Sequence, residues 1–287
     1  MTIPFYIVDV FAEKKYAGNQ LAVFFDAENL SDTEMQTIAR EINFAESTFI
    51  TNLKRENNTA TIRIFTAEYE MKFAGHPTIG TSWVLMNKIF ENKPQNITLT
   101  VPIGEIPIHQ LGDLVWLQAA QPEFLDTFSA EDFLSFSNLE RTDFDDKFPI
   151  QEVTTGSAFV IVPLQSKAAL ENIILDKTKM NEWLHAHCKT SHRALYFYCL
   201  HGAKLMSRML CIEDNQLKED AATGSASTCL QAFLLKYHSK EIEIINHQGD
   251  FINRPSQIYF NGKLSENHFD IKIGGKTQFV AKGEWEV

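Results

Sequence analysis

The sequence lacks the common motifs of nucleotide-dependent and hydrolytic enzymes. Its 287 residues contain no P-loop, no GxGxxG, no HExxH and no GxSxG segment. The chain is therefore not indicated as an NTPase, a dinucleotide-binding enzyme, a zinc protease or an α/β-hydrolase. Cysteine is also scarce, and the four cysteines include no CxxC pair, which predicts a reduced protein of the cytoplasm. They are Cys188, Cys199, Cys211 and Cys229.

Positive charge is in the minority. The chain has 26 Lys and Arg residues against 37 Asp and Glu residues, and its formal net charge is −11. This balance argues against nucleic acid or an anionic membrane as the main partner. An acidic substrate would therefore need local donors, such as helix N-termini, arginine or histidine. The hydrophobic content of 44% is that of an ordinary globular protein with a substantial core.

Two uncharged segments, each opened by a small-residue turn that contains glycine, organise the chain. The first covers residues 73–86, and Pro77 is well placed there at the first helical position. The second follows the acidic pair Glu219-Asp220 and has no charge until Lys236. A helix that is apolar on every side must be buried, and the second segment is too short to span a membrane. We expect central core helices whose first N–H groups line a pocket.

The segments that lead into the two turns also correspond. Arg63-Ile64-Phe65-Thr66 precedes the first turn, and Arg208-Met209-Leu210-Cys211 precedes the second at nearly the same distance. Either turn alone would indicate only a helix start. Two matched copies predict a duplicated domain, with the two helix N-termini facing a shared cleft. We expect domains at residues 1–115 and 116–287, with the last strand free to cross back to the first domain.

Most of the remaining chain predicts short strands. Ser31 and Glu34 form a capping box at the start of an amphipathic helix that ends near Asn43. Short strands with two buried helices predict an α+β fold in which antiparallel sheets each curl round one helix. Strands are expected at 5–11, 21–25, 44–50, 60–65, 71–73, 97–101, 106–109, 115–118, 155–162, 194–199, 205–212, 242–246, 257–260, 268–273 and 278–282, and a further helix at 180–187.

Two candidate sites are weak. His185, His187, Cys188 and His192 form a metal-like cluster, but their spacing fits no standard zinc site. Ser225 with His76 and Asp220 would supply the groups of a hydrolase triad. We rank this triad low because Ser225 lies inside a helix N-terminus and not at a strained strand-to-helix elbow.

A different set of polar groups carries the main hypothesis: Glu46, His76, Asp220 and Ser225. Glu46 stands between Phe44-Ala45 and Phe49-Ile50, which fits an exposed edge strand as well as a buried acid. A glutamic acid among apolar neighbours can act as acid and base near neutral pH. An imidazole at a helix N-terminus favours its neutral form. The set suits moving protons on a small acidic molecule.

At these residues the sequence resembles the PhzF family of phenazine-biosynthesis-like isomerases, which are similar in fold to diaminopimelate epimerase. The matching motifs occur in family order over nearly the whole chain. They are Gly18-Asn19, Ala45-Glu46-Ser47-Thr48, Phe73-Ala74-Gly75-His76-Pro77, Glu219-Asp220 with Thr223-Gly224-Ser225-Ala226, and Gln248-Gly249 with Arg254-Pro255-Ser256.

The resemblance implies two pseudo-symmetric halves, each a β-barrel wrapped round a helix, with the site in the cleft between them. It implies cofactor-free chemistry in which Glu46 shuttles a proton and His76, Asp220 and Ser225 assist. Epimerase relatives use two cysteines at these turns, whereas the matching positions here are Ala74 and Ala221. The resemblance therefore excludes a two-cysteine racemase.

This sequence also departs from the family pattern. Asn19-Gln20 replaces the usual Asn-Pro, alanine stands at Ala67 and Ala221 where the family often has proline, and Ala45 replaces a common serine. None of these changes removes an ionisable group, but each can reshape the pocket, so the identity of the substrate stays open.

We therefore expect a cytoplasmic, cofactor-independent and metal-independent isomerase of a small carboxylate-bearing metabolite. The alternatives are an epimerase that uses Glu46 and Asp220 on opposite faces, and a small-acid-binding protein without turnover. No nucleic acid or membrane partner is expected, and a homodimer is left open. The substrate-binding residues would be Gly18, Asn19, Gly75, Pro77, Thr78, Thr223 and Gly224.

Overall fold

The chain forms two compact units. A computed structural model describes residues 1–188, 194–213 and 215–287. Met1–Gln118 and Gly274–Val287 form the first unit, and Ala119–Ile273 form the second. The sequence placed the boundary after residue 115 and left the destination of the last strand open; in the structure that strand belongs to the first unit.

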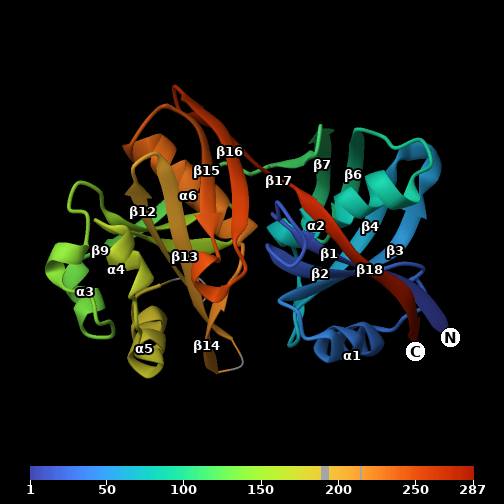
Figure 1. Cartoon of the computed structure of the whole chain (residues 1–287), viewed down its shortest axis with the longest axis horizontal. Helices are drawn as coiled ribbons and strands as arrows, with labels where there is room; N and C mark the ends of the chain where they lie inside the picture. The colour runs from blue at the N-terminus through green and yellow to red at the C-terminus, as the bar shows by residue number, and fades with distance from the viewer. Residues whose placement is uncertain (189–193, 214) are drawn as a thin grey trace. The chain divides into compact units, whose positions relative to one another are not determined.

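The first unit contains a central helix, α2, and a second helix, α1. Strands of the same unit surround α2 in Figure 1, and α2 contacts β1, β2, β3, β6, β7, β8 and β18. The elements are β1 (Thr2–Val10), β2 (Asn19–Phe24), α1 (Asp32–Ile42), β3 (Glu46–Lys54), β4 (Thr59–Phe65), β5 (Glu70–Met71), α2 (Gly75–Val84) with a π-helical turn (Leu85–Ile89), β6 (Asn96–Val101), β7 (Gly104–Leu111), β8 (Leu114–Gln118) and β18 (Thr277–Glu286), with a 3₁₀ turn at Arg55–Asn57.

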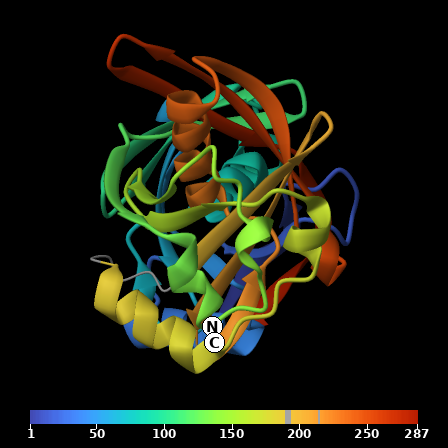
Figure 2. The same ribbon diagram turned by 90° about the vertical axis from the view of Figure 1, so that its left-hand side faces the viewer.

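The second unit is built round α6, which contacts β10, β11, β15 and β16 (Figure 2). Its elements are β9 (Glu123–Phe128), α3 (Ala130–Leu134), β10 (Ile150–Thr154), β11 (Ala158–Pro163), α4 (Lys167–Glu171), α5 (Lys177–His187), β12 (Ala194–His201), β13 (Lys204–Glu213), β14 (Gln216–Asp220), α6 (Gly224–Tyr237), β15 (Glu241–Gln248), β16 (Ser256–Ser265) and β17 (His268–Gly275), with 3₁₀ turns at Arg141–Asp143 and Asp250–Ile252.

The two units repeat one order of elements. In the first unit β2 and β3 are parallel across α1, and β4 and β6 are parallel across β5 and α2. In the second unit β11 and β12 are parallel across α4 and α5, and β13 and β15 are parallel across β14 and α6. The expected α+β class is confirmed. The sheets, however, are mixed and not purely antiparallel, because each helical crossover returns the chain in the same direction.

Each sheet packs a different helix on either face. On β12, Leu195 and Phe197 belong to a core formed with α3, α4 and α5, whereas Tyr196 and Tyr198 point at α6. On β2, Ala22 lies in the core beneath α1. Successive side chains of a strand point to opposite faces, so both faces of these strands are buried. The sequence of a strand that is covered on both faces is a continuous apolar run, so it lacks the alternation of apolar and polar residues that identifies a half-exposed strand.

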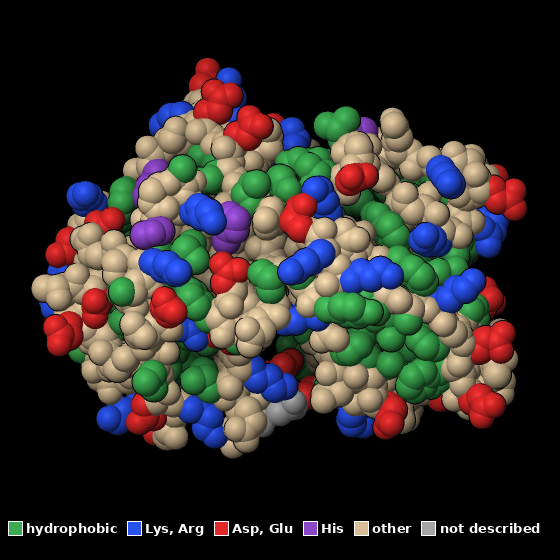
Figure 3. Space-filling view, viewed as in Figure 1, with side chains coloured by type: hydrophobic (Ala, Val, Ile, Leu, Met, Phe, Trp, Pro, Cys, Tyr) green, Lys and Arg blue, Asp and Glu red, His purple; other side chains and the backbone are tan. Residues whose placement is uncertain are grey.

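The surface of the first unit is partly apolar. Phe5, Phe44 and Trp285 pack against the core beneath α1 but remain partly exposed, and Figure 3 shows an apolar area on this unit. Acidic and basic side chains are interspersed on the face shown in Figure 3. None of the helices in residues 1–188, 194–213 and 215–287 combines the length and apolar character that a membrane-spanning helix needs.

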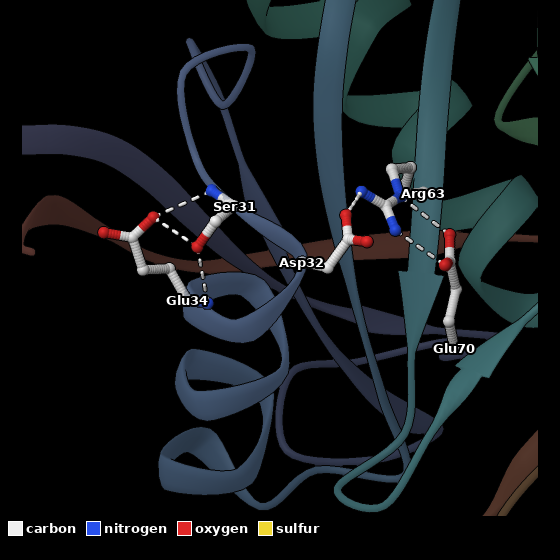
Figure 4. Close-up of polar contacts among 5 residues, drawn as sticks. All are labelled: Ser31, Asp32, Glu34, Arg63 and Glu70. Atoms are coloured by element: carbon white, nitrogen blue, oxygen red, sulfur yellow. Dashed lines mark hydrogen bonds and ion pairs between the residues drawn. The ribbon is translucent and has the colours of Figure 1, made fainter.

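The helix α1 begins and ends at the residues predicted from the sequence. Ser31 Oγ accepts a hydrogen bond from the backbone N–H of Glu34, and the Glu34 carboxylate accepts one from the backbone N–H of Ser31 at 2.7 Å (Figure 4). Asn43 ends the helix in the left-handed conformation, with φ of 54°. The predicted capping box and helix end are confirmed.

Removing this cap should destabilise the first unit without touching the candidate site. Ser31→Ala removes the acceptor for the Glu34 N–H and should lower the free energy of unfolding by about 1 kcal/mol. Ser31→Asp, which retains a capping acceptor, serves as the matched control and should stay close to wild type. Urea unfolding monitored by circular dichroism measures both. Equal losses in the two variants would contradict the assigned role of the cap.

Candidate active site

Glu46 is the first residue of β3 and shares its strand face with Thr48. Since side chains two residues apart on a strand lie on one face, the hydrogen bond between Thr48 Oγ1 and Thr81 Oγ1 of α2, 2.8 Å long, shows which way both residues point. β3 pairs with β2 on one side and β4 on the other, so the interpretation of an exposed edge strand is wrong. The Glu46 side chain is only 15% exposed.

His76 lies beside Glu46. Its Nε2 is 3.4 Å from Glu46 Oε2, and its side chain is 4% exposed. Burial lowers the pKa of the imidazole to about 3, and a backbone hydrogen bond with Gln20 opposes this shift only in part. His76 is therefore neutral at neutral pH, so the contact with Glu46 is not an ion pair. Nε2 is buried and has no hydrogen-bond partner with suitable geometry among the described residues.

Asn19 contacts the other side of the same ring. Its Nδ2 lies 3.4 Å from His76 Nδ1, and the residue is 5% exposed. Gly18, just before it, has φ of 68°, and a Cβ there would overlap the carbonyl oxygen of Val10. Only glycine fits this position. The Gly18-Asn19 pair thus places the Asn19 amide against the His76 imidazole. Asn19 was expected to contact the substrate directly; here its amide contacts His76.

The start of α2 differs from the prediction in one respect. The helix begins at Gly75, with Ala74 as its N-cap, so Pro77 is the third helical residue and not the first. Thr78 donates its hydroxyl to Ala74 O at 2.7 Å and its backbone N–H to the same oxygen at 3.3 Å. Because proline carries no N–H, Gly75 and His76 are the residues whose N–H groups remain for an anion. Thr78, expected to bind substrate, is fully buried.

In the second unit Asp220 is the last residue of β14. Thr223 Oγ1 donates a hydrogen bond to Asp220 Oδ2 at 2.6 Å. The backbone N–H of Thr223 is bound by Gln248 Oε1 at 3.2 Å. Thr223 was expected to bind substrate, but its hydroxyl is directed at Asp220.

Ser225 is the second residue of α6, and Thr223 is its N-cap. Gly224 and all residues from Ala226 to Leu235 are buried, whereas Ser225 is partly exposed. Thr223 provides no side-chain cap to the helix. The first turn therefore combines a hydroxyl with the N–H groups of Gly224 and Ser225, at the positive end of the helix dipole.

An arginine holds the strand that leads into the first turn. Arg63 on β4 donates to both carboxylate oxygens of Glu70 on β5, at 2.7 and 2.6 Å, and to Asp32 at 2.6 Å (Figure 4). Both carboxylates raise the pKa of the guanidinium. Glu70 lies opposite Phe65, two residues after the arginine.

The second unit repeats this clamp at the matching place. Arg208 on β13 donates to Glu219 Oε2 on β14 through Nε at 3.1 Å and Nη2 at 2.6 Å. Glu219 lies opposite Leu210, again two residues after the arginine. The two arginines noted in the sequence before each turn therefore make equivalent ion pairs, which supports the interpretation of a duplication.

Burial keeps three of the four cysteine thiols, those of Cys188, Cys199 and Cys229, from ionising near neutral pH. All four are free, and burial raises the pKa of Cys188 to about 12, of Cys199 to about 11 and of Cys229 to about 12. No group of three or more metal-ligating side chains occurs in the described part of the chain. His185 and His187 are exposed and on α5, whereas His192 lies outside the described residues.

Sequence reasoning gave no role to Gln248 or Tyr196, both fully buried behind Thr223. Tyr196 lies in a continuous apolar strand with no local sign of a polar function. Gln248 belongs to the Gln248-Gly249 motif of the family resemblance, and this motif is the one sequence feature that could have pointed to a role for it. Within each unit the structure brings Glu46 to His76, and Asp220 to Thr223 near Ser225.

Comparisons with known proteins agree on one family. Residues 8–283 match the family described as phenazine biosynthesis-like protein (PhzC-PhzF). The trans-2,3-dihydro-3-hydroxyanthranilate isomerase of Pseudomonas aeruginosa is 32% identical, over 96% of this chain and 97% of its own length. The crystal structure of a PhzF-family phenazine biosynthesis protein from Bacillus anthracis superposes with a TM-score of 0.88 at 26% identity, covering 100% of both chains.

A more distant solved structure shares the fold. A probable proline racemase from Agrobacterium radiobacter K84 superposes with a TM-score of 0.65 at 11% identity, over 99% of this chain and 92% of that chain. At this identity the likeness concerns the fold alone. It confirms the epimerase-like architecture that was expected from the sequence.

The neutral state of His76 predicts a pH dependence of stability. The unfolded imidazole has a pKa of about 6.5, and the folded value is lower, so its contribution is fully present above pH 6.5 and is lost as the pH falls towards 3. Between pH 6.5 and 5 the free energy of unfolding of the wild type should fall by about 2 kcal/mol more than that of His76→Asn. Urea titrations at each pH measure the difference; parallel pH curves would show that His76 takes up its proton in the folded state.

Proposed function

The chain belongs to the phenazine biosynthesis-like protein family and is an isomerase, and from this premise we propose that it moves a proton on a small carboxylate-bearing metabolite by general acid/base catalysis. Glu46 removes a proton from a carbon of the substrate and returns one to another carbon. The double bond shifts between them, so atoms and electrons balance without a redox partner. The reaction needs no cofactor, and the substrate is cyclic or amino-acid-like.

One observation carries this proposal: Nε2 of the buried, neutral His76, which has no hydrogen-bond partner in the described part of the chain, lies 3.4 Å from a carboxylate oxygen of Glu46. An unsatisfied buried polar atom is costly, commonly about 1–3 kcal/mol, and such costs persist at functional sites. A substrate heteroatom that hydrogen-bonds to His76 Nε2 would satisfy the nitrogen and bring a neighbouring carbon close to the Glu46 carboxylate. His76 would then hold the substrate without competing for the proton.

Helix starts are the groups that we propose for binding a substrate carboxylate. In the first unit these are the N–H groups of Gly75 and His76, and in the second unit those of Gly224 and Ser225. A helix N-terminus carries roughly half a positive charge, and the unfavourable effect of the net charge of −11 is overcome locally by such dipoles. Asp220 and Ser225 would position the substrate or relay the proton.

Two alternatives to this isomerase predict different outcomes. An epimerase with Glu46 and Asp220 on opposite faces would invert one stereocentre and leave the double bonds in place. A binding protein would give no exchange at all. Incubation of substrate in D2O separates the binding protein from both enzymes, because proton transfer from an exchanging carboxyl group places deuterium on carbon. The position of the double bonds in the product then separates the isomerase from the epimerase. The four free thiols fit a reducing compartment, for which we propose the cytoplasm.

Removing the acid while keeping its shape gives the direct test. Glu46→Gln should lower the rate by at least ~100-fold, the usual scale of general acid–base catalysis. The first substrate to assay is trans-2,3-dihydro-3-hydroxyanthranilate, which the named relative isomerises, followed by a panel of cyclic and amino-acid-like carboxylates. Deuterium incorporation measured by mass spectrometry reports turnover for any member of the panel.

Glu105→Gln is the matched control, because Glu105 is an exposed glutamate on β7 of the same unit. The substitution removes one negative charge, as Glu46→Gln does, but at a position that does not contact His76. This variant should retain full activity. A folded Glu46→Gln protein with near-normal turnover would remove Glu46 from the mechanism.

A further inference from the structure

The turn that carries Asp220 rests on a fully buried glutamine. Gln248, the last residue of β15, is 0% exposed. Its Nε2 donates to Thr223 Oγ1 at 2.9 Å and to the backbone carbonyl of Asp220 at 2.9 Å. Its Oε1 accepts from the backbone N–H of Thr223 at 3.2 Å and from the hydroxyl of Tyr196 at 2.8 Å. All of the amide's principal hydrogen-bonding positions are used.

Backbone groups fix the orientation of this amide. The Asp220 carbonyl can only accept and the Thr223 N–H can only donate, so Nε2 and Oε1 cannot be exchanged without breaking both bonds. Because Nε2 donates to Thr223 Oγ1, the single hydroxyl proton of Thr223 is left for Asp220. That proton is directed at Asp220 Oδ2, 2.6 Å away. Gln248 thereby determines that Thr223 donates to the carboxylate.

The network of hydrogen bonds continues from Gln248 to Tyr196. Tyr196 Oη receives hydrogen bonds from Asn246 Nδ2 at 2.9 Å and from Ser207 Oγ at 3.0 Å, and passes its own proton towards Gln248. Burial raises the pKa of Tyr196 to about 12, so the phenol remains a donor at working pH. The side-chain donors from Asn246 through Tyr196 and Gln248 to Thr223 therefore point the same way, and aligned hydrogen bonds strengthen one another in a medium of low dielectric constant.

The same hairpin holds the backbone of the turn. Ser256, opposite Gln248 in the β15–β16 ladder, donates its hydroxyl to the carbonyl of Ala221 at 2.9 Å. Gly249 has φ of 76°, and a Cβ there would lie 2.6 Å from the same carbonyl oxygen. The Gln248-Gly249 and Ser256 positions thus touch consecutive peptide groups of the turn.

We propose that Gln248, Tyr196 and Thr223 form a positioning relay that holds the Asp220 carboxylate ionised and in one orientation. All residues of the relay lie within the second unit. Only the effect of the relay on catalysis rests on the proposed function. Thr223 stabilises the charged form of Asp220 by donating a hydrogen bond to its Oδ2 atom. Gln248 and Tyr196 act through Thr223 and touch no reacting atom.

The test reads the carboxyl group of Asp220 directly. In protein labelled with ¹³C at the aspartate carboxyl carbons, Asp220 is assigned by its loss in Asp220→Asn, and its signal is followed against pH. Thr223→Val keeps the shape but removes the donor, and should move the titration midpoint up by about one pH unit. Thr223→Ser restores the hydroxyl and should return the midpoint to that of the wild type.

A pair of tyrosines on β12 separates the relay from general loss of packing. Tyr196→Phe removes the phenol that donates to Gln248 and should move the midpoint of Asp220 in the same direction by a smaller amount. Tyr198→Phe removes an equally buried phenol, which contacts His238 Nε2 at 2.9 Å and not the relay. It should leave the midpoint unchanged, whatever its effect on stability.

The outcomes are distinct. Shifts in Thr223→Val and Tyr196→Phe, with none in Thr223→Ser and Tyr198→Phe, support the relay. Equal midpoints in all four variants, or equal shifts in both tyrosine variants, overturn it. A shifted midpoint with unchanged turnover supports the relay and removes Asp220 from the proposed mechanism. Because the carboxyl signal needs no substrate, failure of the proposed isomerisation leaves this test intact.

Discussion

Burial of two helices that carry almost no charged side chains, α2 and α6, is the constraint on which this structure depends. Such a helix needs cover all round, and each unit provides it with strands on several sides of α2 or α6. Close cover requires small residues: a Cβ on Gly80 of α2 would lie 2.6 Å from side-chain atoms of both Leu21 and Val10. The cost of this arrangement falls at the helix N-terminus, where N–H groups have no partner within the helix. A buried helix start must be satisfied by neighbouring groups or by a ligand, and the candidate residues His76 and Ser225 lie at these two starts.

The duplicated framework carries different chemistry in its two copies. His76 and Ser225 are each the second residue of the central helix. The first unit thus has an imidazole at this place, with Glu46 beside it, and the second unit has a hydroxyl. Arg63 and Arg208, in contrast, make the same ion pair in both units. The duplication retained the clamp that shapes each turn, while the residues at the turns diverged.

The sequence predicted those features that depend on local chemistry. The capping box at Ser31 and the two buried helices follow from the nearest neighbours in the chain, and so were found. Pro77 misled by two positions, because proline is tolerated throughout the first turn of a helix and marks its start only roughly. The Glu46 environment could not be decided, because it depends on β2 and β4 pairing on either side of β3. The Tyr196–Gln248 bond joins residues 52 apart, and no local pattern announces it.

The positions of the cysteines bear on which side chains the proposed mechanism can use to transfer protons. A thiol catalyst must ionise near neutral pH, which needs a positive neighbour or a helix N-terminus. Cys229 is on α6, but it is buried six residues after the N-cap Thr223, and burial raises its pKa to about 12. Ala74, the N-cap of α2, and Ala221, two residues before the N-cap of α6, have no ionisable side chain. The proposed mechanism therefore gives the proton transfer to a carboxylate, and Glu46 has beside it a buried imidazole that stays neutral. In that proposal the burial that keeps Cys229 protonated also keeps His76 neutral, so Glu46 would exchange its proton with the substrate and not with His76.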